Sequence, residues 1–270
     1  MTQAKGRKSI LVTGAASGIG AETARLFVKR GWFVGAFDID EPGLSDLADV
    51  LGSDNCITGR LDVRDREDWA RSVEAFLAST DGRLHVLFNN AGIARTNWFE
   101  DIAPQDHDAI IDVNLKGVIH GIEACLPALK NTQGARIVNT ASVTAIAAMP
   151  RLAVYAATKH AVHGLTDALD LEFSSLGIRV LSLMPWFIDT NILNDASNDG
   201  SNRPGKTQLT EAGVDVYPAS LAAETVWQAV HGKKTHYMVG KAAEQARFFS
   251  RFFPGIVRKR MASSMPPRED

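Results

Sequence analysis

The sequence predicts an α/β protein built on a mostly parallel sheet of seven strands with helices on both faces. Short apolar, β-prone runs recur along the chain, and longer segments of helical period lie between them. This alternation is typical of parallel sheets, because a parallel neighbour is reached through a crossover, usually a helix. The predicted strands cover residues 9–14, 33–39, 56–63, 84–92, 136–142, 178–185 and 236–240.

A single domain is expected for the whole chain, 1–270, with its core at about 8–240. The sequence contains no internal repeat, low-complexity tract or Gly/Ser linker that would divide it, and α/β folds of this length are often one unit. Right-handed crossovers then give a doubly wound, Rossmann-type sheet. We expect the functional site at the carboxyl ends of the strands, where the strand order reverses.

The bulk composition favours a small molecule as partner. A formal net charge of -2 gives no electrostatic reason to expect nucleic acid. The two cysteines, Cys56 and Cys125, lack metal-ligand spacing, and the seven histidines form no HExxH motif, so no metal site is predicted. Neither a signal-peptide pattern nor an apolar run of 18 residues is present, and the expected location is the cytoplasm.

A glycine-rich loop, "TGAASGIG" at 13–20, joins the first predicted strand to a helix that ends at Gly31. Glycines allow a tight turn and close approach of a ligand, and the free N–H groups of a helix start attract a pyrophosphate. A plain tight turn is the alternative, but a position between strand and helix favours a phosphate site. The predicted cofactor contacts in this loop are Gly14, Ser17, Gly18, Ile19 and Gly20.

Asp38 ends the second predicted strand, about twenty residues further on. A carboxylate at this position accepts hydrogen bonds from an adenosine ribose and repels a 2′-phosphate. The glycine loop contains no Arg or Lys that would bind such a phosphate. Asp38 therefore favours NAD over NADP, and the alternative is that it caps the next helix.

Five motifs in order along the chain resemble the short-chain dehydrogenase/reductase family, over about residues 8–240. They are "TGAASGIG" at 13–20, "LDV" at 61–63, "NNAG" at 89–92, Ser142 followed by Tyr155 and Lys159, and "PWFIDT" at 185–190. The resemblance implies an oxidoreductase that uses NAD or NADP. It also implies a dimer or tetramer, paired through the helical segments 104–130 and 153–176.

The resemblance assigns further residues to the cofactor. Asp62 and the Val63 backbone would meet the adenine, while Asn89 and Ala91 would support the sheet beside a ribose. The last motif would add contacts from Pro185, Ile188 and Thr190. In this motif Trp186 follows Pro185 where the family usually has glycine, which leaves the local backbone in question and suggests an indole in the pocket wall.

Tyr155 and Lys159 are four residues apart and so share one helix face. A nearby cation favours the phenolate of a tyrosine, and we expect Lys159 together with oxidised nicotinamide to lower the pKa of Tyr155. Tyr155 would then be the general acid or base, and Ser142 would hydrogen-bond the substrate oxygen. By resemblance, Asn114 would hold a water linked to Lys159. The alternatives are an ordinary core tyrosine, a strand-end cap at Ser142 and a structural role for Asn114.

The expected reaction interconverts a secondary alcohol and a ketone, with hydride transfer to or from nicotinamide. An NADPH-dependent carbonyl reductase is the first alternative, and a non-catalytic dinucleotide-binding protein is the second. Residues 186–218 are long and polar enough to form a substrate lid. Apolar candidates for the pocket wall favour a hydrophobic substrate, and they are Trp98, Met149, Trp186, Phe187 and Leu193.

The C-terminal extension, about 241–270, contains the basic amphipathic segment "ARFFSRFFPGIVRKRMA" at 246–262. Four phenylalanines recur there at one-turn spacing among arginines and lysines. We expect them to pack against the body, the lid or a neighbouring subunit, since exposed phenylalanines make an aggregation-prone patch. Contact with a membrane surface is the alternative.

Overall fold

The computed structural model describes residue 4 and residues 6–195 and 205–263. Seven parallel strands form the main sheet in the order β3-β2-β1-β4-β5-β6-β9, which confirms the predicted fold class. The strand order reverses between β1 and β4. These strands are β1 (Ser9–Thr13), β2 (Phe33–Asp38), β3 (Cys56–Arg60), β4 (Val86–Asn89), β5 (Arg136–Thr140), β6 (Arg179–Pro185) and β9 (His236–Val239).

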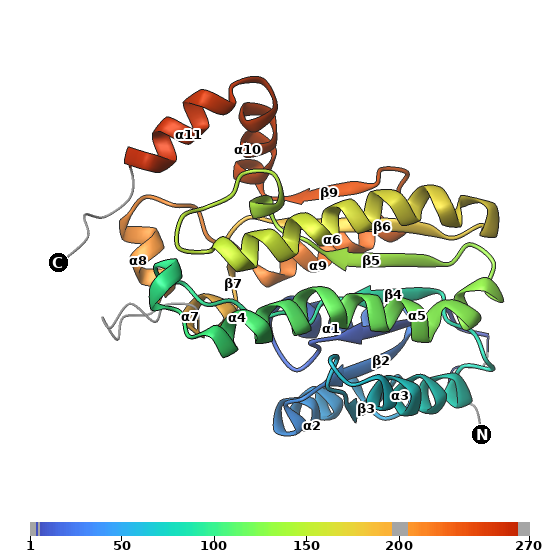
Figure 1. Ribbon diagram of the computed structural model, residues 1–270. Helices are drawn as coiled ribbons and strands as arrows, with labels where there is room; N and C mark the ends of the chain where they lie inside the picture. Colours follow the sequence, from blue (N-terminus) through green and yellow to red (C-terminus); the bar gives the residue numbers. More distant parts are fainter. Residues whose placement is uncertain (1–3, 5, 196–204, 264–270) are drawn as a thin grey trace.

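Helices cover both faces of this sheet (Figure 1). One apolar core lies between the sheet and α1 (Gly18–Lys29), α2 (Glu41–Leu51) and α9 (Ala219–His231). A second core lies between the opposite face and α3 (Arg66–Ser79), α5 (Gly117–Lys130) and α6 (Ala153–Glu172). Burial on both faces explains why the strand sequences are continuously apolar rather than alternating.

Shorter elements complete the chain. A second sheet, which the sequence did not predict, pairs β7 (Ile188–Asp189) with β8 (Tyr217–Pro218) in parallel. One π-helical turn, η2 (Asp112–Lys116), joins α4 (Pro104–Ile111) to α5. The 3₁₀ turns are η1 (Phe99–Asp101), η3 (Val143–Ala145) and η4 (Phe173–Leu176), and the remaining helices are α7 (Asn191–Asp195), α8 (Gly205–Glu211), α10 (Lys241–Phe252) and α11 (Pro254–Ser263).

Both cysteines lie in the interior. Cys56 begins β3, Cys125 lies in α5, and neither is in a disulfide. Burial raises the pKa of both thiols, as expected for a group whose charged form is poorly solvated.

Helices α10 and α11 lie outside the two helix layers, beyond the edge strand β9 (Figure 1). None of the described helices is both long enough and apolar enough to cross a lipid bilayer.

Candidate active site

A cavity of about 470 Å³ lies at the carboxyl ends of the strands. Each of the first six strands of the main sheet contributes a wall residue at or just after its last position: Gly14, Asp38, Leu61, Asn90, Thr140 and Pro185. The predicted site residues in the wall are Gly14, Ser17, Gly18, Ile19, Asp38, Asp62, Val63, Ala91, Ser142, Met149, Tyr155, Lys159, Pro185, Trp186, Phe187, Ile188, Thr190 and Leu193.

The glycine loop has no space for a side chain at Gly14 or Gly18. Gly14 and Gly18 have positive φ angles of 66° and 53°, a region that favours glycine. A Cβ atom added at Gly14 would lie 2.8 Å from the Cα of Ala91, and one added at Gly18 would lie 2.7 Å from the Cγ2 of Thr190. Gly20 lies outside the residues that line the cavity, and a Cβ there would collide with the carbonyl of Gly14.

The N-terminus of α1 opens into the cavity through Gly18 and Ile19. Helix geometry leaves the first N–H groups without an intrahelical acceptor, and no acidic residue lies in the first turn. Ser17, the N-cap residue, makes no side-chain cap bond to the helix. This cradle therefore fits the pyrophosphate of a dinucleotide.

Asp38 ends β2 with its carboxylate fixed by two backbone donors. Its Oδ2 accepts from the N–H of Ala16 at 2.9 Å, and its Oδ1 accepts from the N–H of Asp40 at 3.1 Å. The cap of α2 is Asp40, whose side chain accepts from Gly43. Asp38 is therefore not the cap of that helix, and it is free to meet a ribose hydroxyl from the cavity wall.

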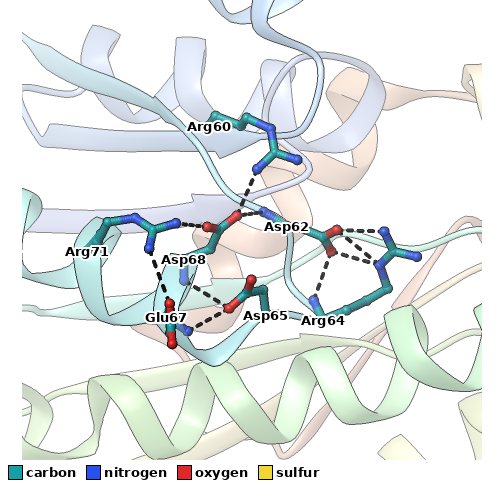
Figure 2. Close-up of polar contacts among 7 residues, drawn as sticks. All are labelled: Arg60, Asp62, Arg64, Asp65, Glu67, Asp68 and Arg71. Carbon is teal, nitrogen blue, oxygen red and sulfur yellow. Dashed lines mark hydrogen bonds and ion pairs between the residues drawn. The ribbon is translucent and has the colours of Figure 1, made fainter.

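Asp62 takes part in a network of charges at the end of β3 (Figure 2). Arg64 donates to both carboxylate oxygens of Asp62, with Nη2 to Oδ2 at 2.6 Å and Nε to Oδ1 at 2.9 Å. This bond lowers the pKa of Asp62 and raises that of Arg64. The network also holds the backbone, because Asp68 accepts from the N–H of Asp62 and from Arg60.

Two predicted asparagines lie behind the cavity wall rather than in it. Asn89 is buried and donates to Asn139 at 2.9 Å, which agrees with a supporting role in the sheet. Asn114, in η2, is fully buried. Its Oδ1 accepts from the N–H of Ile93, and its Nδ2 donates to the carbonyl of Ile93, both at 2.9 Å. The side chain of Asn114 thus holds the "NNAG" turn through Ile93.

Tyr155, Ser142 and Lys159 converge on the cavity. Ser142 lines the same wall and lowers the pKa of Tyr155, and the Nζ of Lys159 lies 5.5 Å from the centre of the Tyr155 ring. Lys159 also donates to the carbonyl of Thr140 at 2.8 Å, which anchors the ammonium against the end of β5. Ser142 caps η3 as well, since its Oγ accepts from the N–H of Thr144 at 3.1 Å.

Without a cofactor, the protein's own groups raise rather than lower the pKa of Tyr155, and lowering by Lys159 together with oxidised nicotinamide stays a prediction. Desolvation by the surrounding atoms raises the pKa of Tyr155 to about 12, and only the hydrogen bond with Ser142 opposes this change. Desolvation likewise lowers the pKa of Lys159 to about 8, which weakens the cation that the prediction relied on. The protein's own groups therefore favour the neutral phenol at physiological pH.

The substrate end of the cavity is mostly apolar. It is lined by Met149, Leu193, Trp186 and Phe187. The rings of Trp186 and Phe187 are perpendicular, with their centres 5.5 Å apart. Trp98, in contrast, lies before η1 and outside the residues that line the cavity. The position of Trp98 after the "NNAG" motif does not determine whether its indole faces the cavity.

The backbone at Trp186 does not need a glycine. Among the described residues only Asp81 and Arg151 have a positive φ without being glycine, so Trp186 adopts an ordinary conformation. Its N–H lies 3.4 Å from the carbonyl of Val239 and continues the pairing of β6 with β9. Tryptophan in place of the family's usual glycine at position 186 therefore changes the wall of the pocket without distorting the end of β6.

Sequence reasoning did not single out several wall residues. Asn90 donates through Nδ2 to the carbonyls of Thr13 and Gly14 and so braces the glycine loop. Ile39 directly follows Asp38, and Arg64 lies two residues after Asp62. Their adjacency to those motifs was the available signal.

A cluster outside the cavity joins α6 to the edge strand β9. His236 lies 2.9 Å from Asp167 through Nε2, and its Nδ1 lies 2.8 Å from the Oγ of Ser182. The ring of His163 stacks on that of His236 at 4.2 Å, and the possible ligand atoms of His163, Asp167 and His236 lie within 4.8 Å of one another. Ligand spacing could not predict this group, because its histidines are far apart in sequence. Both ring nitrogens of His236 already have partners, Asp167 at Nε2 and Ser182 at Nδ1.

Comparison with known proteins identifies the family. The model of the short chain dehydrogenase family matches residues 8–200. The chain is 37% identical to a cyclohexanol dehydrogenase from Acinetobacter over 190 residues, which cover 69% of this chain and 75% of that protein. It is 33% identical to a D-threitol dehydrogenase from Mycolicibacterium smegmatis over 224 residues, covering 82% and 85% of the two chains.

Solved structures agree with the sequence comparison. A short-chain dehydrogenase/reductase from Burkholderia phymatum in complex with NAD superposes with a TM-score of 0.81 and 26% identity, covering 97% of this chain and 98% of the other. A short-chain dehydrogenase from Burkholderia cenocepacia in complex with NADP gives a TM-score of 0.79 and 25% identity, covering 98% and 100%. Matching fold, glycine loop and family model together show that the chain belongs to the short-chain dehydrogenase/reductase family, whose members are oxidoreductases that bind a nicotinamide dinucleotide.

Proposed function

We propose that the protein interconverts a hydrophobic secondary alcohol and a ketone, with NAD as its cofactor and Tyr155 as general acid or base. The observation that carries this proposal is the group of Tyr155, Ser142 and Lys159 on one wall of the cavity, where Ser142 lowers the pKa of Tyr155. The glycine cradle and Asp38 lie in the same cavity, so a bound dinucleotide and a substrate would share it.

In the alcohol-oxidising direction, the phenolate of Tyr155 accepts the hydroxyl proton while the carbinol C–H bond breaks. Bound nicotinamide supplies the acceptor for that hydride, or its donor in the reverse direction. The O–H of Ser142 stabilises negative charge on the tyrosine or the substrate oxygen. Lys159, anchored on the carbonyl of Thr140, would hold ribose hydroxyls, while Asn114 acts at a distance by fixing the Ile93 turn.

The preference for NAD rests on the charges around the adenosine end. The fixed carboxylate of Asp38 would repel a 2′-phosphate. The two described arginines that line the cavity are already paired, Arg64 with Asp62 at 2.6 Å and Arg95 with Asp106 at 3.4 Å. A 2′-phosphate would have to share these guanidinium groups with Asp62 or Asp106, whereas a ribose hydroxyl needs only the acceptor that Asp38 offers.

A hydrophobic substrate is supported by the wall formed by Met149, Trp186, Phe187 and Leu193. The Acinetobacter relative is a cyclohexanol dehydrogenase, and we carry that substrate class to this chain as part of the proposal. The proposed lid, 186–218, contributes cavity residues up to Leu193, and its residues 196–204 lie outside the described part of the chain.

The test is to titrate the purified protein with NADH and with NADPH by fluorescence, then to assay cyclic and acyclic secondary alcohols and ketones with the cofactor that binds more tightly. Tight NADH binding with turnover of apolar alcohols is the expected result. Tight NADPH binding alone would favour a carbonyl reductase, and binding without any turnover would favour a non-catalytic dinucleotide-binding protein. Light scattering on the same sample tests the proposed dimer or tetramer.

A further inference from the structure

Five large apolar side chains gather on the outside of α10 and α11. Phe248, Phe249, Phe252 and Phe253 are 53%, 46%, 58% and 45% exposed, and Ile256 is 62% exposed. The prediction that these phenylalanines pack against the body of the same chain is therefore wrong. Isolated exposed apolar residues are normal, but a continuous patch indicates a contact surface.

The aromatic rings contact one another rather than the core. Phe248 lies 5.0 Å from Phe252 and 5.7 Å from Phe249 between ring centres, and Phe249 lies 6.1 Å from Phe253. Because each ring stays about half exposed, the cluster presents one apolar face to the outside. Its neighbour on the inner side of α10 is the buried Ala243.

Basic residues are frequent in these two helices, and the guanidinium carbon of Arg251 lies 5.8 Å from the centre of the Phe252 ring. Residues 241–263 contain six Lys or Arg and one acidic residue, Glu244, so their net charge is 6 − 1 = +5, and the rest of the chain must carry −2 − 5 = −7. In the part of the chain that the structure describes, no ion pair involves any of the six. They are Lys241, Arg247, Arg251, Arg258, Lys259 and Arg260.

We propose that α10 and α11 bind the surface of an anionic lipid bilayer, with the phenylalanines inserted at the headgroup boundary and the basic residues on the lipid phosphates. Amphipathic helices with aromatic residues on one face and Lys/Arg on the other bind membranes in this way. Helices of 12 and 10 residues are too short to span a bilayer, so they lie in its surface.

Charge favours this partner over a second copy of the chain. A two-fold symmetric contact puts the same patch of both subunits face to face, which would bring two segments of +5 together. An anionic membrane instead offers negative charge and an apolar layer at the same depth, and it satisfies both features of the patch.

Helix α10 is connected to the cavity through η3. Helix α10 contacts η3, whose first residues follow Ser142, and Val143 and Thr144 line the cavity wall. A lipid surface bound at α10 would therefore lie near the proposed substrate end and could supply apolar alcohols or ketones. This last point rests on the proposed function, whereas membrane binding does not.

The experiment is sedimentation of the full chain with phosphatidylcholine vesicles, with and without phosphatidylserine. We expect binding to the vesicles that contain phosphatidylserine, and loss of binding in high salt. Phe248→Ser with Phe252→Ser should weaken vesicle binding at least about 10-fold, because the inserted area is lost. Arg258→Gln with Lys259→Gln and Arg260→Gln should weaken it by a similar factor through lost charge.

Phe99→Ser is the matched control, since Phe99 is 61% exposed but lies in η1, outside the patch. Circular dichroism and NADH binding establish that each variant is folded. Failure of the wild-type chain to bind phosphatidylserine vesicles overturns the proposal. So does a result in which the phenylalanine variants change only the oligomeric mass measured by light scattering, since the patch would then be a subunit contact. Inactivity towards alcohols, with vesicle binding intact, would instead count against the proposed function.

Discussion

The Oδ2 atom of Asp38 accepts a 2.9 Å hydrogen bond from the backbone N–H of Ala16. This bond joins the end of β2 to the glycine loop, and it fixes the carboxylate in the cavity wall. The residue proposed to select the cofactor is thus held by the loop proposed to bind the pyrophosphate.

Asp38→Asn removes the charge and keeps one of the two oxygen acceptors that now bind the N–H groups of Ala16 and Asp40. We expect the ratio of the dissociation constant of NADPH to that of NADH to fall at least about 10-fold, or about 1.4 kcal/mol. Fluorescence titration with both cofactors measures it. Asp40→Asn, the same change at the cap of α2, is the control and should leave the ratio unchanged. An unaltered ratio in Asp38→Asn would show that the carboxylate does not select the cofactor.

Tyr155→Phe should reduce turnover at least about 100-fold, because the general acid or base is lost. Binding of NADH should stay nearly intact, since the ring still fills its place in the wall. Steady-state assays beside a cofactor titration separate the two effects. Near-normal turnover would remove Tyr155 from the mechanism.

Ser142→Ala should move the pH dependence of alcohol oxidation. The hydrogen bond from Ser142 lowers the pKa of Tyr155, so its removal raises that pKa. Oxidation needs the deprotonated phenol, and its rate therefore rises with pH. In the variant this rise should occur at higher pH, measured as kcat/KM across the alkaline range. A profile that keeps its position but drops in height would assign Ser142 to the substrate oxygen alone.

Lys159→Met should change how stability depends on pH. Desolvation lowers the pKa of Lys159 from 10.5 to about 8. Between these values the unfolded chain binds more protons than the folded one, so the stability of the wild-type protein rises with pH there. The buried charge costs at most about 3 kcal/mol below pH 8. Methionine carries no charge, so the variant avoids this cost. The stability of the variant relative to wild type should therefore be greatest below pH 8 and should fall as pH rises from about 8 to 10.

Denaturant unfolding across that pH range tests this prediction. Lys29→Met, at the exposed end of α1, is the control and should show a constant difference from wild type. If the difference for Lys159→Met were also constant, burial would not perturb this lysine. Above pH 10 the raised pKa of Tyr155 acts in the opposite direction in both proteins, since the unfolded tyrosine then loses its proton first.

Gly20→Ala should destabilise the fold by about 1–3 kcal/mol, the usual cost of overpacking. Its new methyl would meet the carbonyl of Gly14 and the side chain of Asn90. Gly164→Ala on α6, where nothing lies within 4 Å of the added atom, should instead stabilise by about 0.5–1 kcal/mol. Thermal unfolding of both variants gives the comparison, and equal effects would contradict the close packing of the loop.

All seven main strands were predictable, because each combines an apolar run with a clear interruption. The predicted strand 84–92 is observed only as Val86–Asn89, and the next three residues, Asn90, Ala91 and Gly92, leave the sheet to line the cavity. The pair β7–β8 was missed because two residues per strand produce no pattern. The π-helical turn around Asn114 was also missed, as apolar spacing does not distinguish it from a regular helix.

The candidate site was predictable where a motif fixes the backbone and less so elsewhere. Gly14, Asp38, Ser142, Tyr155 and Lys159 follow strand ends or share a helix face, so sequence position determines where they lie. Whether Trp98 faced the cavity, and whether α10 packed on the body, depended on contacts between distant segments. The pKa of Tyr155 depended on desolvation, which sequence spacing does not measure.

The two buried cysteines have a practical consequence. Since burial raises the pKa of both Cys56 and Cys125, the thiolates that react with alkylating reagents are scarce in the folded protein. We expect the native chain to resist such reagents and mild oxidants. A single substitution such as Ser263→Cys, at the exposed end of α11, would then be labelled selectively, and a fluorophore attached there would report the depth at which the C-terminal helices meet a bilayer.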